Sequence, residues 1–216
     1  MYKRQLEGLK PTLLYPVIGI GLIGAIMIFV NPFFGGINEI ITNFLNSMGS
    51  TSRILLGIVV AGMMAIDMGG PFNKAAYVFG TASLASGNFE VMAAVMAGGM
   101  VPPLAIALAS TFFKSKFTKR ERQSALTNYI MGLSFITEGA IPFAAADPLR
   151  VIPSCVVGSA TAGALTMLFQ CQLRAPHGGM FVLPVIGNPF GFLGAVVIGS
   201  VVGMIMLALL KKKVVE

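Results

Sequence analysis

One carboxylate, Glu138, lies inside an otherwise apolar stretch, residues 134–148 (SFITEGAIPFAAADP). A charged side chain at membrane depth costs at least a few kcal/mol, so it is rarely kept there without a task. Gly139, Pro142 and Pro148 interrupt a regular helix beside the acid and free backbone groups. Transporters commonly build polar substrate sites at such breaks. Glu138 is therefore predicted to accept hydrogen bonds from paired hydroxyls or to act as a general base; the alternative is a purely structural pair with a basic residue.

A second polar cluster occupies residues 67–77 (DMGGPFNKAAY), after an apolar segment. The amide of Asn73 and the ammonium of Lys74 can donate hydrogen bonds to hydroxyls or to an incoming phosphoryl group. The alternative is a turn punctuated by glycine and proline, in which Asp67 and Lys74 are solvated. The residue types alone leave both interpretations open.

A third cluster, residues 174–179 (RAPHGG), contains His177, the only histidine of the chain. It is a candidate phosphoryl carrier, general base or ligand. It does not predict a metal site, because no Cys, Asp or Glu stands nearby at ligand spacing. The flanking proline and glycines favour a rigid turn whose backbone N–H groups suit an anion. The alternative is a histidine in a loop at the membrane interface.

Other polar or reactive residues are interpreted as structural. Asp147 and Arg150 are close enough in sequence to pair at a helix end. Cys155 and Cys171 are separated by sixteen residues, about 24 Å in a helix, which is too far for a disulfide. The sequence has no phosphate-binding loop, no dinucleotide fingerprint and no Ser-His-Asp order, so no cofactor and no metal are predicted.

The composition indicates where these clusters reside. Of 216 residues, 56% are hydrophobic and only 11% are charged, with a mean hydropathy of +0.84. A soluble domain carries about 25% charged residues. The 26 glycines and 12 prolines are better tolerated in membrane helices than in soluble ones. We expect an all-α integral membrane protein with no separate soluble domain and no cleaved signal peptide.

The formal net charge is +7, and the basic residues gather at segment ends. This positive-inside pattern places both termini and the loop 114–123 in the cytoplasm. Nucleic-acid binding is not predicted, because the loop lies between spans and lacks interleaved aromatics. The clusters are Lys3, Arg4 and Lys10; Lys114, Lys116, Lys119, Arg120 and Arg122; and Lys211, Lys212 and Lys213.

The segmentation predicts a polytopic helical bundle of about six spans, with broken helices and re-entrant hairpins. The double proline Pro102-Pro103 is expected to kink or break its helix. The expected elements are a span at 12–30 stopped by Asn31-Pro32, an interfacial amphipathic helix at 36–50, a span at 52–66, a half-span or hairpin arm at 75–87, a span at 90–113, a short apolar helix at 124–137, a span at 151–172, a re-entrant or broken element at 173–189, and a last span at 190–210.

Three segments in this order resemble those of the fructose-type C component of enzyme II. This is the membrane permease of the bacterial phosphoenolpyruvate-dependent sugar phosphotransferase system. The segments are Asp67–Tyr77, Ile136–Ala144 (ITEGAIPFA) and Arg174–Gly179. The resemblance covers nearly the whole chain. It implies an all-helical fold in which re-entrant hairpins enclose a central sugar, in a homodimer in the bacterial inner membrane.

The resemblance also implies a mechanism of group translocation. The permease binds fructose or a fructose-like sugar, and a phosphorylated B component, charged through the A component and the general phosphotransferase proteins, phosphorylates it. Glu138 would hold the sugar hydroxyls, and the phosphoryl group would not rest on this chain. The residues assigned to the sugar site are Asn73, Lys74, Thr137, Glu138 and His177, with Asp67 and Arg174 in support.

Residues 1–216 are expected to form a single C-type membrane domain, short at its N-terminus relative to the family and without an A or B domain. Two other interpretations stay open. An ion-coupled secondary transporter also uses broken helices and a buried acid, and needs no phosphoryl donor. A non-transporting membrane fragment would keep these motifs only through ancestry.

Overall fold

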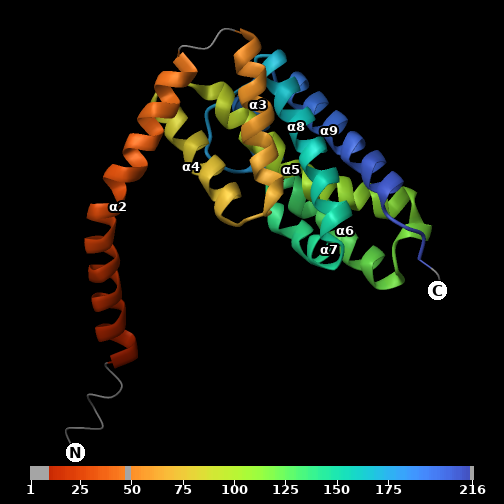
Figure 1. Cartoon of the computed structure of the whole chain (residues 1–216), viewed down its shortest axis with the longest axis horizontal. Coiled ribbons are helices and arrows are strands. Elements are labelled where there is room, and N and C mark those ends of the chain that lie inside the picture. The colour runs from red at the N-terminus through yellow and green to blue at the C-terminus, as the bar shows by residue number, and fades with distance from the viewer. Residues whose placement is uncertain (1–9, 47–49, 215–216) are drawn as a thin grey trace, which may run out of the picture. The chain divides into compact units, whose positions relative to one another are not determined.

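The chain is almost entirely helical, which confirms the all-α membrane class (Figure 1). The computed structural model describes residues 10–46 and 50–214. It divides into two units, Met1–Ser47 and Met48–Glu216. The first contains a π-helical turn η1 (Lys10–Leu14) and α2 (Tyr15–Asn46). The second contains α3 (Ser50–Ile66), α4 (Pro71–Ala85), α5 (Phe89–Phe112), η2 (Lys114–Lys116), α6 (Lys119–Leu133), η3 (Thr137–Ala140), α7 (Ile141–Ala146), α8 (Pro148–Leu168), β1 (Gln172–Leu173), η4 (Gly179–Val185), β2 (Ile186–Gly187) and α9 (Pro189–Leu210).

Helix α2 is longer than predicted. A span stopped at Asn31-Pro32 and a separate amphipathic helix at 36–50 were expected, but the backbone is helical from Tyr15 to Asn46 with Pro32 inside. The prediction of a stop is therefore wrong. A proline removes one helical hydrogen bond, and the turns on either side can continue when the sequence around it is strongly apolar. Residues 47–49 of the expected amphipathic segment lie outside the described residues.

Helix α5 is the centre of the second unit, and nearly all of its residues are buried. It contacts α3, α4, α6, α8 and α9. In the described part of the chain, α5, α8 and α9 are long and apolar enough to cross a membrane, and shorter apolar helices cover Tyr15–Val30 and Arg53–Ile66. The predicted segments 52–66, 151–172 and 190–210 correspond to α3, α8 and α9.

The double proline does not break α5, contrary to one of the two predicted outcomes. Pro102 and Pro103 have no N–H to donate to the carbonyls of Gly98 and Gly99, four residues earlier. Hydroxyls from neighbouring elements replace these donors. Ser159 Oγ donates to the Gly98 carbonyl oxygen at 2.7 Å, and Thr137 Oγ1 of η3 donates to the Gly99 carbonyl oxygen at 2.9 Å. The helix continues because both freed carbonyls are satisfied from outside.

Small residues let the helices approach closely. A Cβ added at Gly158 would lie 2.6 Å from the carbonyl oxygen of Gly199, and the reverse distance is also 2.6 Å. A Cβ at Gly57 would lie 2.5 Å from the oxygen of Gly163. These contacts join α8 to α9 and α3 to α8, and they are typical of helix packing in membranes.

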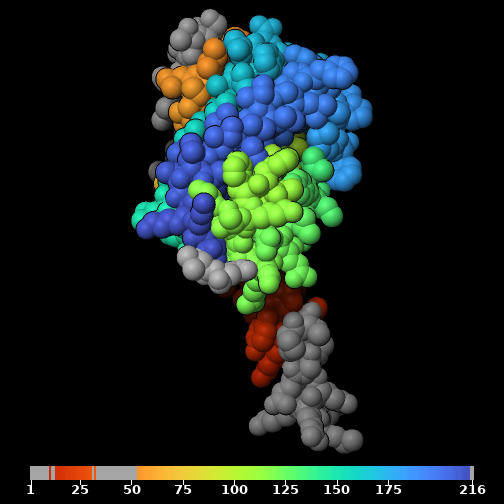
Figure 2. All heavy atoms as spheres, turned by 90° about the vertical axis from the view of Figure 1, so that its right-hand side faces the viewer, coloured from red at the N-terminus to blue at the C-terminus, as the bar shows by residue number. Residues whose placement is uncertain are grey.

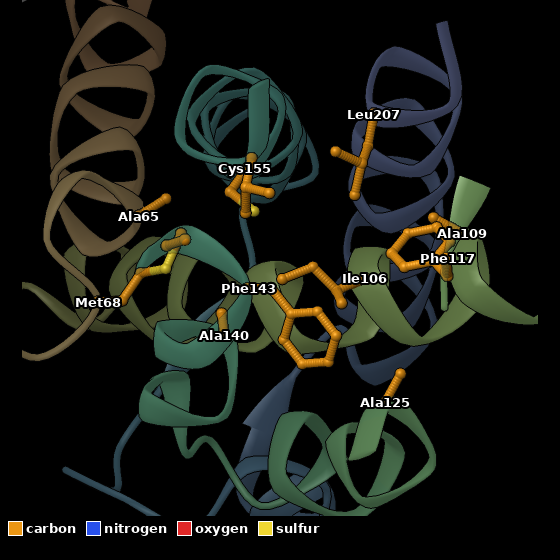
Figure 3. Close-up of a cluster of buried hydrophobic side chains, with 12 residues drawn as sticks. Ala65, Met68, Ile106, Ala109, Phe117, Ala125, Ala140, Phe143, Cys155 and Leu207 are labelled. Atoms are coloured by element: carbon orange, nitrogen blue, oxygen red, sulfur yellow. The ribbon is translucent and has the colours of Figure 1, made fainter. Parts of the chain in front are cut away.

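A cluster of buried apolar side chains joins the turn after α3 to the short helices η3 and α7 (Figure 3). Met68, in the turn 67–70, is 1% exposed and lies in the same cluster as Ala140 of η3. Phe143 of α7 points toward Ile106 of α5 in Figure 3. The turn after α3 and the broken segment η3–α7 are therefore fixed against one another by the core.

The segment expected at 173–189 is not a continuous helix, as predicted. It forms a small hairpin in which Gln172 pairs with Gly187 and Leu173 pairs with Ile186, antiparallel, with η4 between the two strands. The predicted short apolar helix at 124–137 is instead α6, which begins at Lys119 and ends at Leu133.

The early start of α6 has a local cause. Thr118 and Glu121 form a capping box, with Glu121 N–H donating to Thr118 Oγ1 at 3.1 Å and Thr118 N–H donating to Glu121 Oε2 at 2.8 Å. The cap sits next to the end of α9, because Lys211 Nζ donates to Glu121 Oε1 at 3.0 Å. Lys116 Nζ donates to the carbonyl oxygens of Ala208 and Lys211. On the face in Figure 2, α6 and the basic loop (green) lie beside the C-terminal end of α9 (dark blue).

The cap of α6 gives a stability prediction. Replacing Glu121 with Ala removes the reciprocal cap and leaves Lys211, whose side chain is 10% exposed, without its carboxylate. We expect the variant to lose about 1–2 kcal/mol of unfolding free energy at pH 7, measured by thermal unfolding in detergent. Arg120→Gln, an exposed change one residue earlier, is the control and should leave the midpoint unchanged. Equal midpoints for Glu121→Ala and the wild type would contradict the stabilising role.

The same carboxylate predicts a pH dependence. Burial raises the pKa of Glu121, but hydrogen bonds from the Thr118 backbone and from Lys211 outweigh burial and hold the pKa below its ordinary value of 4.5. The folded pKa is below the unfolded one, so the charge stabilises the fold above about pH 4.5, and this is lost as the pH falls through the folded pKa. The stability gap between Glu121→Ala and the wild type should be full at pH 7 and shrink below pH 4.5.

Candidate functional site

The candidate site lies about halfway along α5. Its reference point is Gly99, which is ten residues after Phe89 and thirteen before Phe112. At 1.5 Å per residue, these separations are about 15 and 20 Å. Thr137 in η3 donates its hydroxyl to the Gly99 carbonyl oxygen at 2.9 Å. The segment that contains Glu138 is therefore attached about halfway along α5, the most buried helix of the unit.

A cavity of about 180 Å³ opens at this level. It brings together the five residues predicted for direct sugar contact, although they come from three separate segments of the chain. Its lining consists of Met64, Asn73, Lys74, Tyr77, Phe135, Ile136, Thr137, Glu138 and His177.

Glu138 faces a cation across the cavity. Lys74 Nζ lies 3.4 Å from Glu138 Oε1, and the two side chains are 61% and 45% exposed. The break between α6 and η3 directs the carboxylate into the open cavity and not into the protein core. At this exposure the pair contributes little to stability, which leaves both groups free to exchange their mutual contact for a ligand.

A glycine allows Glu138 to take this position. Gly69 has a φ of +121°, which an L side chain rarely adopts. A Cβ at Gly69 would lie 2.9 Å from Glu138 Cγ and 3.0 Å from its Oε1. The turn between α3 and α4 therefore packs its bare backbone against the acid.

Asp67 supports the site indirectly. Its Oδ2 accepts from Phe72 N–H at 2.6 Å and its Oδ1 accepts from Asn73 N–H at 2.9 Å. These are amides of the first turn of α4, where a carboxylate also favours the positive end of the helix dipole. Asp67 does not line the cavity. It holds the helix end that carries Asn73 and Lys74.

Asn73 is more engaged with the protein than the sequence indicates. It is 3% exposed, and its Nδ2 donates to the Met64 carbonyl oxygen at 2.8 Å. This hydrogen bond joins the start of α4 to the end of α3. One amide N–H and the amide oxygen are left for a ligand.

Three rings form one wall of the cavity. The ring centroids of Phe135 and His177 are 5.0 Å apart, those of Tyr77 and Phe135 are 6.1 Å apart, and those of Tyr77 and His177 are 6.2 Å apart. The sequence reasoning missed Tyr77 and Phe135 as site residues. Tyr77 lies one helical turn after Asn73 and so shares its face, a signal that was available. Phe135 has a φ of 62°, which no sequence pattern shows.

Arg174 is not brought into this cavity. Its guanidinium lies over the Phe89 ring, 5.2 Å from the centroid, and it lines a separate cavity beside the β1–β2 hairpin. Asp147 and Arg150 form the predicted pair, with an N–O distance of 3.0 Å at the start of α8. Both cysteines are free.

Comparison with known proteins decides the family. A family profile described as "Phosphotransferase system, EIIC" matches residues 7–158, most of the chain. The chain belongs to this EIIC family. The matched range includes α4 and η3, with the Lys74–Glu138 pair, and ends before His177.

Named relatives of this EIIC chain are close in sequence. It is 54% identical to the "PTS system fructose-specific EIIABC component" of Bacillus subtilis (strain 168), over 99% of the chain and 34% of the relative. It is 53% identical to the "Fructose permease IIC component" of Bacillus amyloliquefaciens, over 99% of the chain and 70% of the relative. The "PTS system fructose-specific EIIC component" of Haloferax volcanii is 44% identical over 94% of the chain and 55% of its own length. The chain thus spans about a third to 70% of these relatives. No solved structure matches it.

The contact between Gly69 and Glu138 gives a prediction. Gly69→Ala forces both the unusual φ and a clash with the glutamate, so we expect a loss of about 1–3 kcal/mol in unfolding free energy, measured by thermal unfolding in detergent. Gly87→Ala is the matched control, since Gly87 has a φ of +77° but no atom within 4 Å of an added Cβ.

The two variants separate backbone strain from the contact. Gly69→Ala should be the more destabilising of the two, and adding Glu138→Ala should recover part of the difference, because it removes the Cγ that the new methyl meets. Equal losses in Gly69→Ala and Gly87→Ala would contradict the packing of Gly69 on Glu138.

Proposed function

We propose that this EIIC chain is the sugar-binding part of a phosphotransferase-system permease that takes fructose or a fructose-like sugar. One observation carries the proposal. Asn73 and Lys74 of α4, Thr137 and Glu138 of η3, and His177 of the later loop line a single cavity halfway along α5. Membrane transporters place substrate sites at such a depth, where helices are broken.

The chemistry of the cavity suits a polyol. The carboxylate of Glu138 can accept hydrogen bonds from two adjacent hydroxyls, and the Lys74 ammonium can donate to a third. The three-ring wall gives an apolar surface to the C–H face of a sugar, and the His177 ring adds a nitrogen at its edge. In this proposal the sugar replaces the 3.4 Å contact between Lys74 and Glu138 with hydrogen bonds of its own.

Phosphorylation is proposed to occur at the same cavity with a phosphoryl group carried by a separate B component. Glu138 would take the proton of the attacking hydroxyl as general base, and Lys74 would offset the negative charge of the incoming phosphoryl group. The fusion of A, B and C components in relatives named EIIABC and EIIB'BC supports a B component as the partner. The A component and the general phosphotransferase proteins would stand upstream.

The proposal includes an orientation. The basic loop and the end of α9 lie together, because Lys116 donates to the Lys211 carbonyl oxygen. Basic residues favour the cytoplasmic side, so we place this end of the unit, and both termini, in the cytoplasm of a cell with the chain in its inner membrane. The cavity is then about 20 Å from the cytoplasmic end of α5. A homodimer, as the family resemblance implies, belongs to the same proposal.

The decisive experiment uses everted vesicles that contain the chain, alone or with the preceding segment of a relative in trans. They are supplied with a matching B component, the general phosphotransferase proteins, phosphoenolpyruvate and labelled fructose. We expect Glu138→Gln to lower sugar phosphate formation by at least about 10²-fold, because the variant loses the base and the charged acceptor. Glu90→Gln is the control. Glu90 forms an ion pair with Arg53 at an N–O distance of 3.6 Å, and neither residue lines the cavity.

The alternatives predict other outcomes. Uptake of unmodified sugar driven by an ion gradient would replace the proposal with a secondary transporter. No uptake under any condition, with the preceding segment supplied, would leave a non-transporting fragment. Equal sugar phosphate in Glu138→Gln and wild type would remove Glu138 from the mechanism.

A further inference from the structure

Two backbone acceptors in α5 have lost their helical donors. Pro102 and Pro103 carry no N–H, so the carbonyls of Gly98 and Gly99 cannot make the usual bond to the residue four positions later. Both carbonyls belong to buried residues of α5, where an unpaired acceptor is costly.

The two acceptors receive hydroxyls from different places. The carbonyl of Gly98 accepts from Ser159 Oγ in the middle of α8, a continuous helix. The carbonyl of Gly99 accepts from Thr137 Oγ1 of η3, a four-residue helical turn in which Glu138 directly follows Thr137. Thr137 is 3% exposed, and its hydroxyl donates its hydrogen to the Gly99 carbonyl oxygen.

Gly99 also makes the contact sterically possible. A Cβ at this position would lie 2.9 Å from Thr137 Oγ1 and would overlap the ring of Phe135. The turn can therefore reach the backbone of α5 only over a glycine. Gly99 permits the close approach, and its carbonyl is the acceptor because Pro103 has no N–H to occupy it. Thr137 is the donor.

We propose that Thr137 is a positioning residue, which acts through the carbonyl that Pro103 leaves free on Gly99 and so sets where Glu138 stands in the cavity. This differs from the direct sugar contact that the sequence predicts for Thr137. The effect on transport rests on the proposed function, but the position of residue 138 does not.

The test measures that position without sugar. Glu138→Cys places a thiol at the site, and Cys155 and Cys171 are both buried, so a membrane-impermeant maleimide reports on position 138. The labelling rate is compared in purified chain with Thr137, Thr137→Ser and Thr137→Val. We expect Thr137→Ser to label at the original rate and Thr137→Val to change the labelling rate by roughly 10-fold, since loss of the hydrogen bond frees the turn.

Pro103→Ala distinguishes two roles of Thr137: positioning residue 138, and donating a hydrogen bond to the Gly99 carbonyl oxygen. The new N–H at position 103 can donate to Gly99, so Pro103→Ala should restore the unfolding temperature of Thr137→Val. It should not restore the labelling rate, because the turn is still detached. If Thr137→Val is too unstable to purify alone, the pair Pro103→Ala and Pro103→Ala/Thr137→Val gives the same comparison.

Ser159→Ala is the matched control. It frees the neighbouring carbonyl of Gly98 by the same chemistry, and neither Ser159 nor Gly98 lines the cavity. It should lower the unfolding temperature and leave labelling at position 138 unchanged.

Two results would overturn the proposal. Unchanged labelling in Thr137→Val would show that the bond does not position the turn, and full recovery of labelling by Pro103→Ala would reduce Thr137 to a structural donor. In vesicles with Glu138 intact, Thr137→Val is expected to slow sugar phosphate formation by on the order of 10²-fold, and Thr137→Ser should restore it. If the wild type makes no sugar phosphate, the proposed function fails while the labelling result still stands.

Discussion

The second unit depends on one constraint: a backbone carbonyl buried in α5 must find a donor inside the protein. The double proline creates two such carbonyls side by side, and the answer to each is a side-chain hydroxyl from another element. One of these bonds fastens α8 to the central helix. The other fastens the short turn that bears Glu138. A feature that looks in sequence like a defect of the helix is therefore what locates the acid along it.

Around this point, bare backbone does much of the positioning. Gly69 lies against Glu138 from the turn after α3, while Gly99 lies beneath Thr137 and Phe135. Met68, beside Gly69, is buried in the core with Ala140 of η3. The acid therefore packs on the backbone of Gly69, and the turn that carries it packs on Gly99. The cation opposite the acid comes from a helix whose first-turn amides donate to Asp67.

Residue types single out the candidates for this site, because polar groups in an apolar chain are few and expensive. For Asn73, Lys74 and His177 they leave a turn or loop as the alternative, and only the family resemblance groups these residues with Glu138. The continuity of α2 through Pro32 and of α5 through its double proline could not be found in this way. In α5 the prolines show in the sequence which donors are missing, but the replacements come from tertiary structure. Long-range contacts of this kind have no local periodicity to reveal them.

The glycines around Glu138 have a consequence for how the cavity can change over evolution or in the laboratory. Gly69 and Gly99 have no side chain that could be made slightly smaller or larger. The position of Glu138 is therefore difficult to change through small substitutions at these glycines. Met64 and Ile136 are different, because they line the same cavity with apolar side chains of adjustable volume. For the proposed sugar site, selectivity by sugar size is therefore open to gradual change at Met64 and Ile136, while the polar contacts to the hydroxyls stay fixed.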